Sequence, residues 1–282
     1  MGLSLSLTPG LTSTPREEYQ NLAREYNFTD LGQGFPDYLP EQEIIDSLVQ
    51  SANSKRTPSF SKNVKQNIDP YQDVVITVGA SGALYSAITG HVKLGDEVII
   101  IEPFFTCYKP IIESVGGIIR YIPLRLKSVN DVLRSSDWVL NHAELESLFN
   151  TKTKAIIFNN PHNPYGKVFS LDELEEIANL CKKWNVLCIA DEVYEWLVYE
   201  PRQHIRMASL PGMWERTITI GSAGKVFLVT GWRVGWAMGP SSLIHKLQVE
   251  LPFKPATVHQ VGGKINFTQC NQKYLGSSSQ II

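Results

Sequence analysis

The sequence carries almost no excess charge and no long hydrophobic run. Its 282 residues include 26 Lys and Arg against 28 Asp and Glu, which gives a net charge of −2. A chain with this balance has no overall basic field to attract nucleic acid or an anionic membrane. No apolar stretch approaches the roughly 18 residues that a membrane-spanning helix needs. We therefore expect no nucleic-acid partner and no membrane insertion.

Paired cysteines are also lacking. The four cysteines are Cys107, Cys181, Cys188 and Cys270. None belongs to a C-x-x-C pair, which argues against a zinc site or a disulfide framework. We expect reduced thiols, no metal and a cytoplasmic location. Residues 1–15 do not resemble a secretory signal, and because no acidic residue precedes Glu17, a mitochondrial location stays open as the alternative.

Seven short apolar segments, separated by helical patterns, dominate the chain from residue 74 onward. The segments are 74–78, 97–101, 117–122, 154–158, 186–190, 216–221 and 233–238. The clearest helical pattern covers residues 171–184. Almost wholly apolar strands that alternate with helices predict an α/β fold of three layers, with a mostly parallel sheet covered on both faces. With 43% hydrophobic residues, the chain can bury a sizeable core.

Ligands of such sheets bind at the carboxyl ends of the strands, so the residues after each strand are candidates for a site. Gly79 to Gly82 follow the first predicted strand and precede a helix predicted to begin at Ala83. Their backbone N–H groups suit a phosphate, and the same residues equally suit a plain tight turn. Phe104 and Phe105 follow the second strand, where a ring packs in the core or stacks on a flat heterocycle.

Polar side chains follow three further strands. Asn163 lies in a turn with two Asn-Pro steps, where its amide can donate to a ligand. Asp191 follows an apolar strand, where an acid is either the N-cap of a helix or the partner of a buried cation. Lys225 lies in a small-residue turn beside Ser222, with Arg233 close behind, which suggests a phosphate-facing cluster around a nucleophilic amine.

Together these residue types are the parts that pyridoxal 5′-phosphate requires. A lysine amine forms a Schiff base with its aldehyde, and a buried acid keeps its ring nitrogen protonated. An aromatic platform, donors to the ring oxygen and a phosphate cradle complete the set. The predicted catalytic residues are Lys225, Asp191 and Tyr194. The predicted cofactor-binding residues are Ala80, Ser81, Phe105, Asn163, Asp191, Tyr194, Ser222, Lys225 and Arg233.

The motifs resemble those of a known family. GASGAL, EPFFTCY, NNPHNPYGK, DEVYEWLVY, PGMWERTITIGSAGK and TGWRVGWAMGP are similar to the class I aminotransferases of pyridoxal-phosphate fold type I, and within them to the kynurenine aminotransferase group. The resemblance implies that Lys225 binds the cofactor aldehyde and Asp191 the ring nitrogen. It also implies that Gly34, together with Asn163, contacts the substrate.

This resemblance implies a transaminase that moves an amino group from an L-amino acid to a 2-oxo acid. The implied donors are kynurenine, glutamine and aromatic or sulfur amino acids, with cysteine-S-conjugate β-lyase as a side activity. A homodimer is also implied. The implied regions are an N-terminal arm (1–30), a connector with part of a small domain (31–67), a pyridoxal-phosphate-binding large domain (68–247) and a divergent C-terminal tail (248–282).

Two departures from the family pattern favour other interpretations. After about residue 248 the sequence stops matching, and a segment is shortened between about 51 and 66. We therefore expect an incomplete small domain without the arginine that grips the substrate carboxylate, a pair that contributes on the order of 2–5 kcal/mol. The first alternative is a truncated chain that binds cofactor with weak or absent transamination. The second is an NAD-dependent oxidoreductase with its phosphate turn at Gly79, although the third glycine of that motif is missing.

Overall fold

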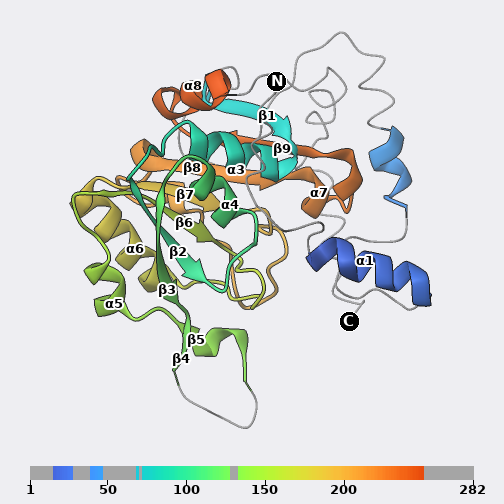
Figure 1. Ribbon diagram of the computed structural model, residues 1–282, viewed down its shortest axis with the longest axis horizontal. Helices are drawn as coiled ribbons and strands as arrows, with labels where there is room; N and C mark the ends of the chain where they lie inside the picture. Colours follow the sequence, from blue (N-terminus) through green and yellow to red (C-terminus); the bar gives the residue numbers. More distant parts are fainter. Residues whose placement is uncertain (1–14, 28–38, 47–67, 70–71, 128–132, 251–282) are drawn as a thin grey trace, which may run out of the picture. The chain divides into compact units, whose positions relative to one another are not determined.

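The computed structural model describes residues 15–27, 39–46, 68–69, 72–127 and 133–250. The chain divides into two compact units, residues 1–39 and 40–282. In the first unit, helix α1 (Pro15–Tyr26) is described, and most of its described side chains are exposed. The second unit contains the sheet (Figure 1). The predicted region boundaries after residues 30, 67 and 247 stay predictions.

A seven-stranded sheet forms the centre of the second unit. Its strands are β1 (Val74–Val78), β2 (Glu97–Glu102), β3 (Ile118–Pro123), β6 (Thr153–Asn159), β7 (Leu187–Asp191), β8 (Thr217–Ser222) and β9 (Val234–Met238). Their spatial order is β1-β9-β8-β7-β6-β2-β3, and β9 runs antiparallel to both of its neighbours. The remaining pairs are parallel. The predicted α/β fold with a mostly parallel sheet is confirmed, and each predicted strand lies within one residue of its observed bounds.

Helices cover both faces of this sheet. They are α3 (Gly79–Thr89), α4 (Tyr108–Ser114), α5 (His142–Ser147), α6 (Leu171–Trp184), α7 (Ala223–Val226) and α8 (Ser241–Glu250). Short 3₁₀ turns are η1 (Ser135–Asp137), η2 (Met207–Ser209), η3 (Trp214–Arg216) and η4 (Thr230–Trp232). Helices α3, α4 and α8 pack on one face, and α5 and α6 pack on the other. The result is the three-layer arrangement that the alternation of strands and helices predicts.

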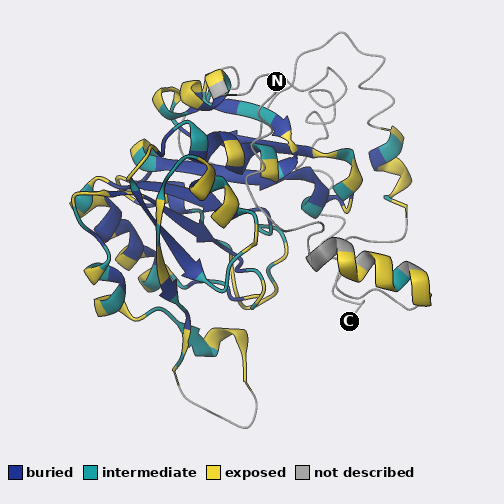
Figure 2. Ribbon diagram, viewed as in Figure 1, coloured by how far each residue is buried: buried dark blue, intermediate teal, exposed yellow. Residues whose placement is uncertain are grey.

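Strand β2 shows how one strand supplies both cores. Val98 and Ile100 pack with α3 and α4, whereas Ile99 and Ile101 pack with α5 and α6. Successive residues of a strand point to opposite faces, so a strand covered on both sides must be apolar throughout. The central strands are accordingly buried along their length (Figure 2).

Helix α6 has the bounds that its sequence pattern predicts. Ser170 caps the first turn by accepting from the Glu173 N–H, and the Glu173 carboxylate accepts from the Ser170 N–H in return. Asn185 ends the helix in the left-handed conformation, with φ of 52°. This capping box and left-handed cap satisfy backbone groups that the helix itself leaves unpaired.

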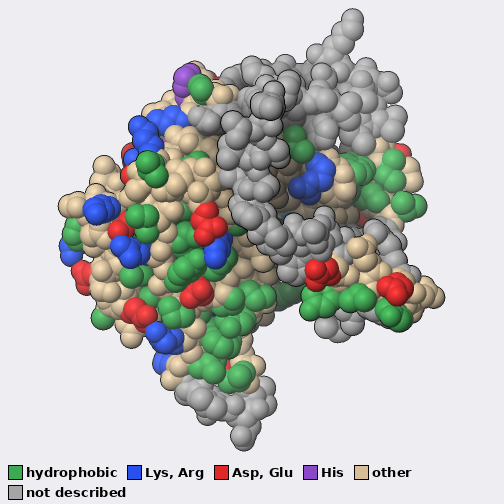
Figure 3. All heavy atoms as spheres, in the orientation of Figure 1, with side chains coloured by type: hydrophobic (Ala, Val, Ile, Leu, Met, Phe, Trp, Pro, Cys, Tyr) green, Lys and Arg blue, Asp and Glu red, His purple; other side chains and the backbone are tan. Residues whose placement is uncertain are grey.

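The remaining described segments are short. Strands β4 (Arg125–Leu126) and β5 (Trp138–Val139) form a small antiparallel pair. Residues 42–46 are helical, and Ile44 packs against a third core cluster. Most of the implied connector at 31–67 lies outside the described residues. No helix in the described ranges is long and apolar enough to cross a bilayer. Figure 3 shows acidic and basic side chains interspersed on the visible face of the sheet-bearing unit.

Candidate active site

The carboxyl ends of the parallel strands bring most of the predicted site residues to one edge of the sheet (Figure 1). Strands β1, β2, β6, β7 and β8 end there, and the antiparallel β9 begins there. The predicted residues that lie at or just beyond this edge are Ala80, Ser81, Phe105, Asn163, Asp191, Tyr194, Ser222, Lys225 and Arg233. Gly34 lies outside the described residues.

The Gly-rich segment after β1 is the first turn of a helix. The prediction that the helix begins at Ala83 is wrong, because α3 begins at Gly79. Gly79 has φ of +67°, which glycine adopts without steric cost, and its N–H donates to the Arg233 carbonyl at 2.7 Å. No side chain caps this helix end. The N–H groups of Ala80 and Ser81 therefore have no partner within the helix and are suited to bind an anion.

The guanidinium of Arg233 lies against this turn. A Cβ atom at Gly79 would stand only 2.7 Å from Nη2 of Arg233. Arg233 Nη1 donates to the Thr230 carbonyl at 3.1 Å, and Arg233 itself has φ of +51°. Such a backbone conformation is uncommon outside glycine and is concentrated at functional sites. The positive charge of Arg233 and the N-terminus of α3 thus lie together at the carboxyl end of β1. We call this place the corner of the site.

Gly235 brings Ser222 to the same corner. In the sheet Gly235 lies opposite Ser222 on one side and Thr77 on the other. A Cβ atom at Gly235 would stand 2.5 Å from the Ala80 nitrogen, so only glycine permits this close approach. Ser222, the Arg233 guanidinium and the start of α3 thus lie at one corner, and their donors have the chemistry of a phosphate site.

Asp191 ends β7 as a buried carboxylate that is 3% exposed. Tyr108 donates its hydroxyl to Oδ2 at 2.5 Å, and the Val193 N–H makes a longer contact with Oδ1 at 3.4 Å. Burial raises the pKa of Asp191 to about 6, against the lowering effects of Tyr108 and of the Lys225 charge. The alternative that Asp191 caps a helix is wrong, because the residues that follow it form turns.

The two phenylalanines after β2 have different environments. Phe104 stacks on Tyr121 at 5.8 Å between ring centroids and packs against the core. Phe105 is 38% exposed, and its ring contacts Tyr108 edge to face at 6.0 Å. Phe105 is therefore the more exposed of these two rings, and it lies next to Tyr108, the hydrogen-bond partner of Asp191.

Asn163, Tyr194 and Lys225 are linked to one another. A hydrogen bond from Asn163 lowers the pKa of Tyr194, although burial raises that pKa more strongly. Lys225 Nζ lies 5.6 Å from the centroid of the Tyr194 ring. The Asn163 N–H donates to Asn159 Oδ1 at 2.6 Å, and Asn159 Nδ2 donates to the Asp191 carbonyl at 2.9 Å. The turn that carries Asn163 is thereby tied to the strand that carries Asp191.

Sequence reasoning missed three residues of this edge. They are Tyr108, Asn159 and Gly235. Tyr108 and Asn159 both lie inside motifs that carry other site residues. Tyr108 could have been found as a polar group shortly after the aromatic pair, and Asn159 as a polar group at the end of an apolar strand. The importance of Gly235 depends on the strand order, which the sequence does not contain.

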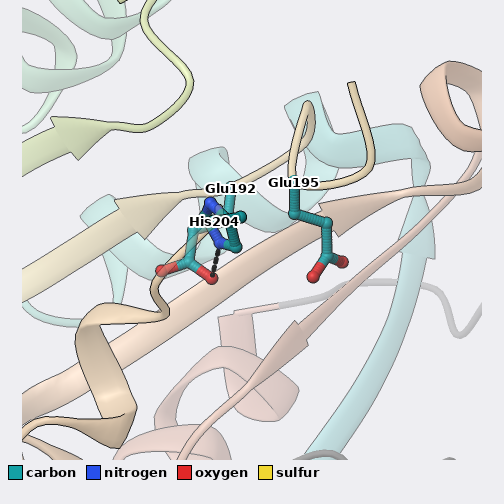
Figure 4. A group of neighbouring side chains, drawn as sticks. All are labelled: Glu192, Glu195 and His204. Carbon is teal, nitrogen blue, oxygen red and sulfur yellow. Dashed lines mark hydrogen bonds and ion pairs between the residues drawn. The ribbon is translucent and has the colours of Figure 1, made fainter. Parts of the chain in front are cut away.

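A second group of titratable side chains follows directly in the chain. One carboxylate oxygen of Glu192, one of Glu195 and one ring nitrogen of His204 lie within 4.8 Å of one another (Figure 4). Glu192 Oε1 accepts from the Met207 N–H at 3.0 Å, and Oε2 lies 3.3 Å from His204 Nε2. Glu195 pairs with Arg206. These contacts join the turn after Asp191 to the segment that leads into η2.

Known proteins share this fold and these motifs. The chain matches the family described as aminotransferase class I and II over residues 27–251, and it belongs to that family. It is 48% identical over 257 residues to kynurenine–oxoglutarate transaminase 3 of Rattus norvegicus, covering 85% of this chain and 57% of the relative. It is 44% identical over 271 residues to kynurenine–oxoglutarate transaminase 1 of Mus musculus, covering 89% and 62%. The chain thus spans less than two thirds of either relative.

Solved structures agree with the sequence matches. N-succinyldiaminopimelate aminotransferase of Mycobacterium tuberculosis superposes with a TM-score of 0.83 and 32% identity, over 94% of this chain and 72% of that one. An aromatic aminotransferase of Pyrococcus horikoshii gives a TM-score of 0.76 and 29% identity, over 92% and 72%. The predicted family and fold are confirmed, and these matches do not favour the nicotinamide-dependent alternative.

Membership of this family implies use of pyridoxal 5′-phosphate, and the described residues fit that group. Among the described residues, the donors to the Asp191 carboxylate are the neutral Tyr108 hydroxyl and Val193 N–H, so a protonated ring nitrogen would be a suitable cationic partner for this buried acid. Gly79 and Gly235 let the Arg233 guanidinium and the start of α3 come close together, because a Cβ atom at either position would clash with them.

Proposed function

We propose that this chain binds pyridoxal 5′-phosphate at the described edge and transfers amino groups from L-amino acids to 2-oxo acids. The observation that carries the proposal is that buried Asp191 and half-buried Lys225 come from the ends of two adjacent parallel strands, beside a phosphate cradle. When bound, the cofactor supplies an electrophilic aldehyde and an electron-withdrawing protonated ring.

Each residue of the chain has a role in this proposal. Ser222, Arg233 and the first N–H groups of α3 hold the phosphate by charge-assisted hydrogen bonds. Phe105 covers one face of the ring and limits its contact with water. Asp191 stabilises the proton on the ring nitrogen, a pairing that offsets the cost of burying its carboxylate.

The reactive amine belongs to Lys225. Its Nζ lies over the Tyr194 ring and within the electrostatic influence of Asp191. In the proposed reaction this amine would hold the aldehyde of the cofactor. After the substrate amine has replaced it there, the free Lys225 amine would move the proton at the substrate Cα as general base and acid. Asn163 and Tyr194 donate to the ring oxygen, and Asn163 also contacts the substrate.

The substrate proposal follows the sequence relatives. Relatives at 48% and 44% identity are kynurenine–oxoglutarate transaminases. We therefore propose kynurenine, glutamine and aromatic or sulfur amino acids as donors and a 2-oxo acid as acceptor, with β-lyase action on cysteine S-conjugates as a side reaction. A homodimer and a cytoplasmic location belong to the same proposal.

The decisive experiment is the absorbance of the chain purified with pyridoxal 5′-phosphate. We expect a visible band from lysine-bound cofactor that disappears in Lys225→Ala and persists in Lys93→Ala, a change at an exposed position. A missing band in the unchanged chain contradicts the proposal. Turnover is then measured with kynurenine or glutamine and a 2-oxo acid, so that cofactor binding and transamination are scored separately.

A further inference from the structure

Tyr108 and Asp191 form a buried pair that joins the start of α4 to the end of β7. The phenol hydroxyl donates to Asp191 Oδ2 at 2.5 Å, and the two residues are 2% and 3% exposed. A hydrogen bond to an ionised acceptor is stronger than a neutral one, and burial keeps water from replacing it. The hydroxyl is therefore the principal fixed donor to this carboxylate.

The ring of Tyr108 is itself held in place. It contacts Phe105 edge to face at 6.0 Å and stacks on Phe104 at 6.5 Å. The hydroxyl bonds Oδ2, whereas the contact of Oδ1 with the Val193 N–H is long, at 3.4 Å. An ionised carboxylate offers about four acceptor positions, so Oδ1 keeps capacity for a further donor.

We propose that Tyr108 is a positioning residue, whose hydroxyl fixes the orientation of the Asp191 carboxylate and sets how tightly that carboxylate holds a proton. The consequence for catalysis rests on the proposed function, because Asp191 must leave the proton on the cofactor ring rather than take it. The pairing itself is a property of the chain alone. It is therefore testable without cofactor.

Other charges also act on Asp191. Within the described part of the chain, the other titratable groups that face it are Cys107, Glu192, Tyr194 and Lys225. The charge of Lys225 lowers the pKa of Asp191 and the charge of Glu192 raises it. Tyr108 lowers the same pKa through its hydrogen bond, so removal of the hydroxyl alone isolates this contribution.

The test follows the carboxyl infrared band of Asp191 against pH in the cofactor-free chain. The band is assigned by its loss in Asp191→Asn. In Tyr108→Phe we expect proton binding to Asp191 to tighten roughly tenfold, since a hydrogen bond to a charged group is lost. The matched control is Tyr121→Phe, because Tyr121 also stacks on Phe104, at 5.8 Å. Its titration midpoint should equal that of the unchanged chain.

A second variant keeps the shape of the side chain. Fluorotyrosine placed at position 108 has a more acidic hydroxyl, which donates more strongly, so the Asp191 midpoint should move to lower pH. An unchanged midpoint in both variants, or an equal change in Tyr121→Phe, overturns the proposal. If the midpoints shift as expected but no cofactor band forms in the unchanged chain, the proposed function fails while the pairing stands.

Discussion

Arg233 and Gly79 share one corner of the site so closely that no side chain fits between them. A Cβ atom at Gly79 would lie 2.7 Å from Nη2 and 2.9 Å from Cζ of Arg233. The guanidinium and the helix start therefore act on the same ligand atoms. A guanidinium and a helix N-terminus both attract negative charge, so this corner suits a multiply charged anion such as phosphate.

Gly79→Ala should weaken binding of pyridoxal 5′-phosphate by about tenfold, because the new methyl group displaces the guanidinium. It also strains a backbone with positive φ by about 1–2 kcal/mol. Calorimetric titration measures the affinity, and urea unfolding measures the strain. Gly95→Ala is the matched control, since Gly95 has φ of +84° with no atom within 4 Å of the added Cβ. An equal loss of affinity in that control means that strain alone is responsible.

Asp191→Asn should change how the stability of the cofactor-free chain depends on pH. The pKa of Asp191 is raised to about 6 by burial, so its contribution to stability is present at low pH and is lost as pH rises through about 6. The variant lacks this loss. Between pH 4 and pH 7 its free energy of unfolding should therefore gain on the order of 2–3 kcal/mol relative to the unchanged chain. Urea unfolding across this range measures the difference. If Asp172→Asn, at an exposed position, gives the same gain, the effect does not belong to the buried carboxyl.

His162→Gln should change the dependence in the opposite direction. Burial, aided by the charge of Lys167, lowers the pKa of His162 to about 4. The folded chain then binds fewer protons than the unfolded chain, and stability is lost as pH falls from about 6.5 to about 4. Without the imidazole, the free energy of unfolding should fall by on the order of 3 kcal/mol less over this pH range, as thermal or urea unfolding would measure. His245→Gln, at an exposed position, is the control, and an equal sparing there refutes the assignment.

Arg206→Met should destabilise the chain by about 3–5 kcal/mol, because it leaves Glu195 buried without its cation. The Glu195 side chain is 7% exposed, and its pKa is raised by burial despite the nearby guanidinium. The double change with Glu195→Gln should recover much of the loss, as a double-mutant cycle of unfolding free energies would show. Additive effects of the two changes contradict the pairing. Arg202→Met, at an exposed position, serves as the control.

The strands and the edge of the sheet were predictable because apolar runs and the residues after them are local features. Asp191 and Lys225 could be placed at one edge from the parallel sheet alone. The start of α3 could not, because the Gly79 N–H donates to the carbonyl of Arg233, a residue far along the chain that directly precedes β9. Tyr108 was missed for a similar reason. It lies 83 positions from Asp191, and only the fold brings the two together.

The antiparallel direction of β9 has a consequence for how the site assembles. Strand β8 delivers Lys225 to the edge, and β9 departs from that same edge after only α7 and η4, so Arg233 arrives by a short return rather than a full crossover. The reactive amine and the phosphate anchor are thus near neighbours along the chain. Contacts of short sequence separation form early and at low entropic cost. This half of the site should therefore assemble as one local unit, before the distant strands that supply Asp191 and Phe105 complete it.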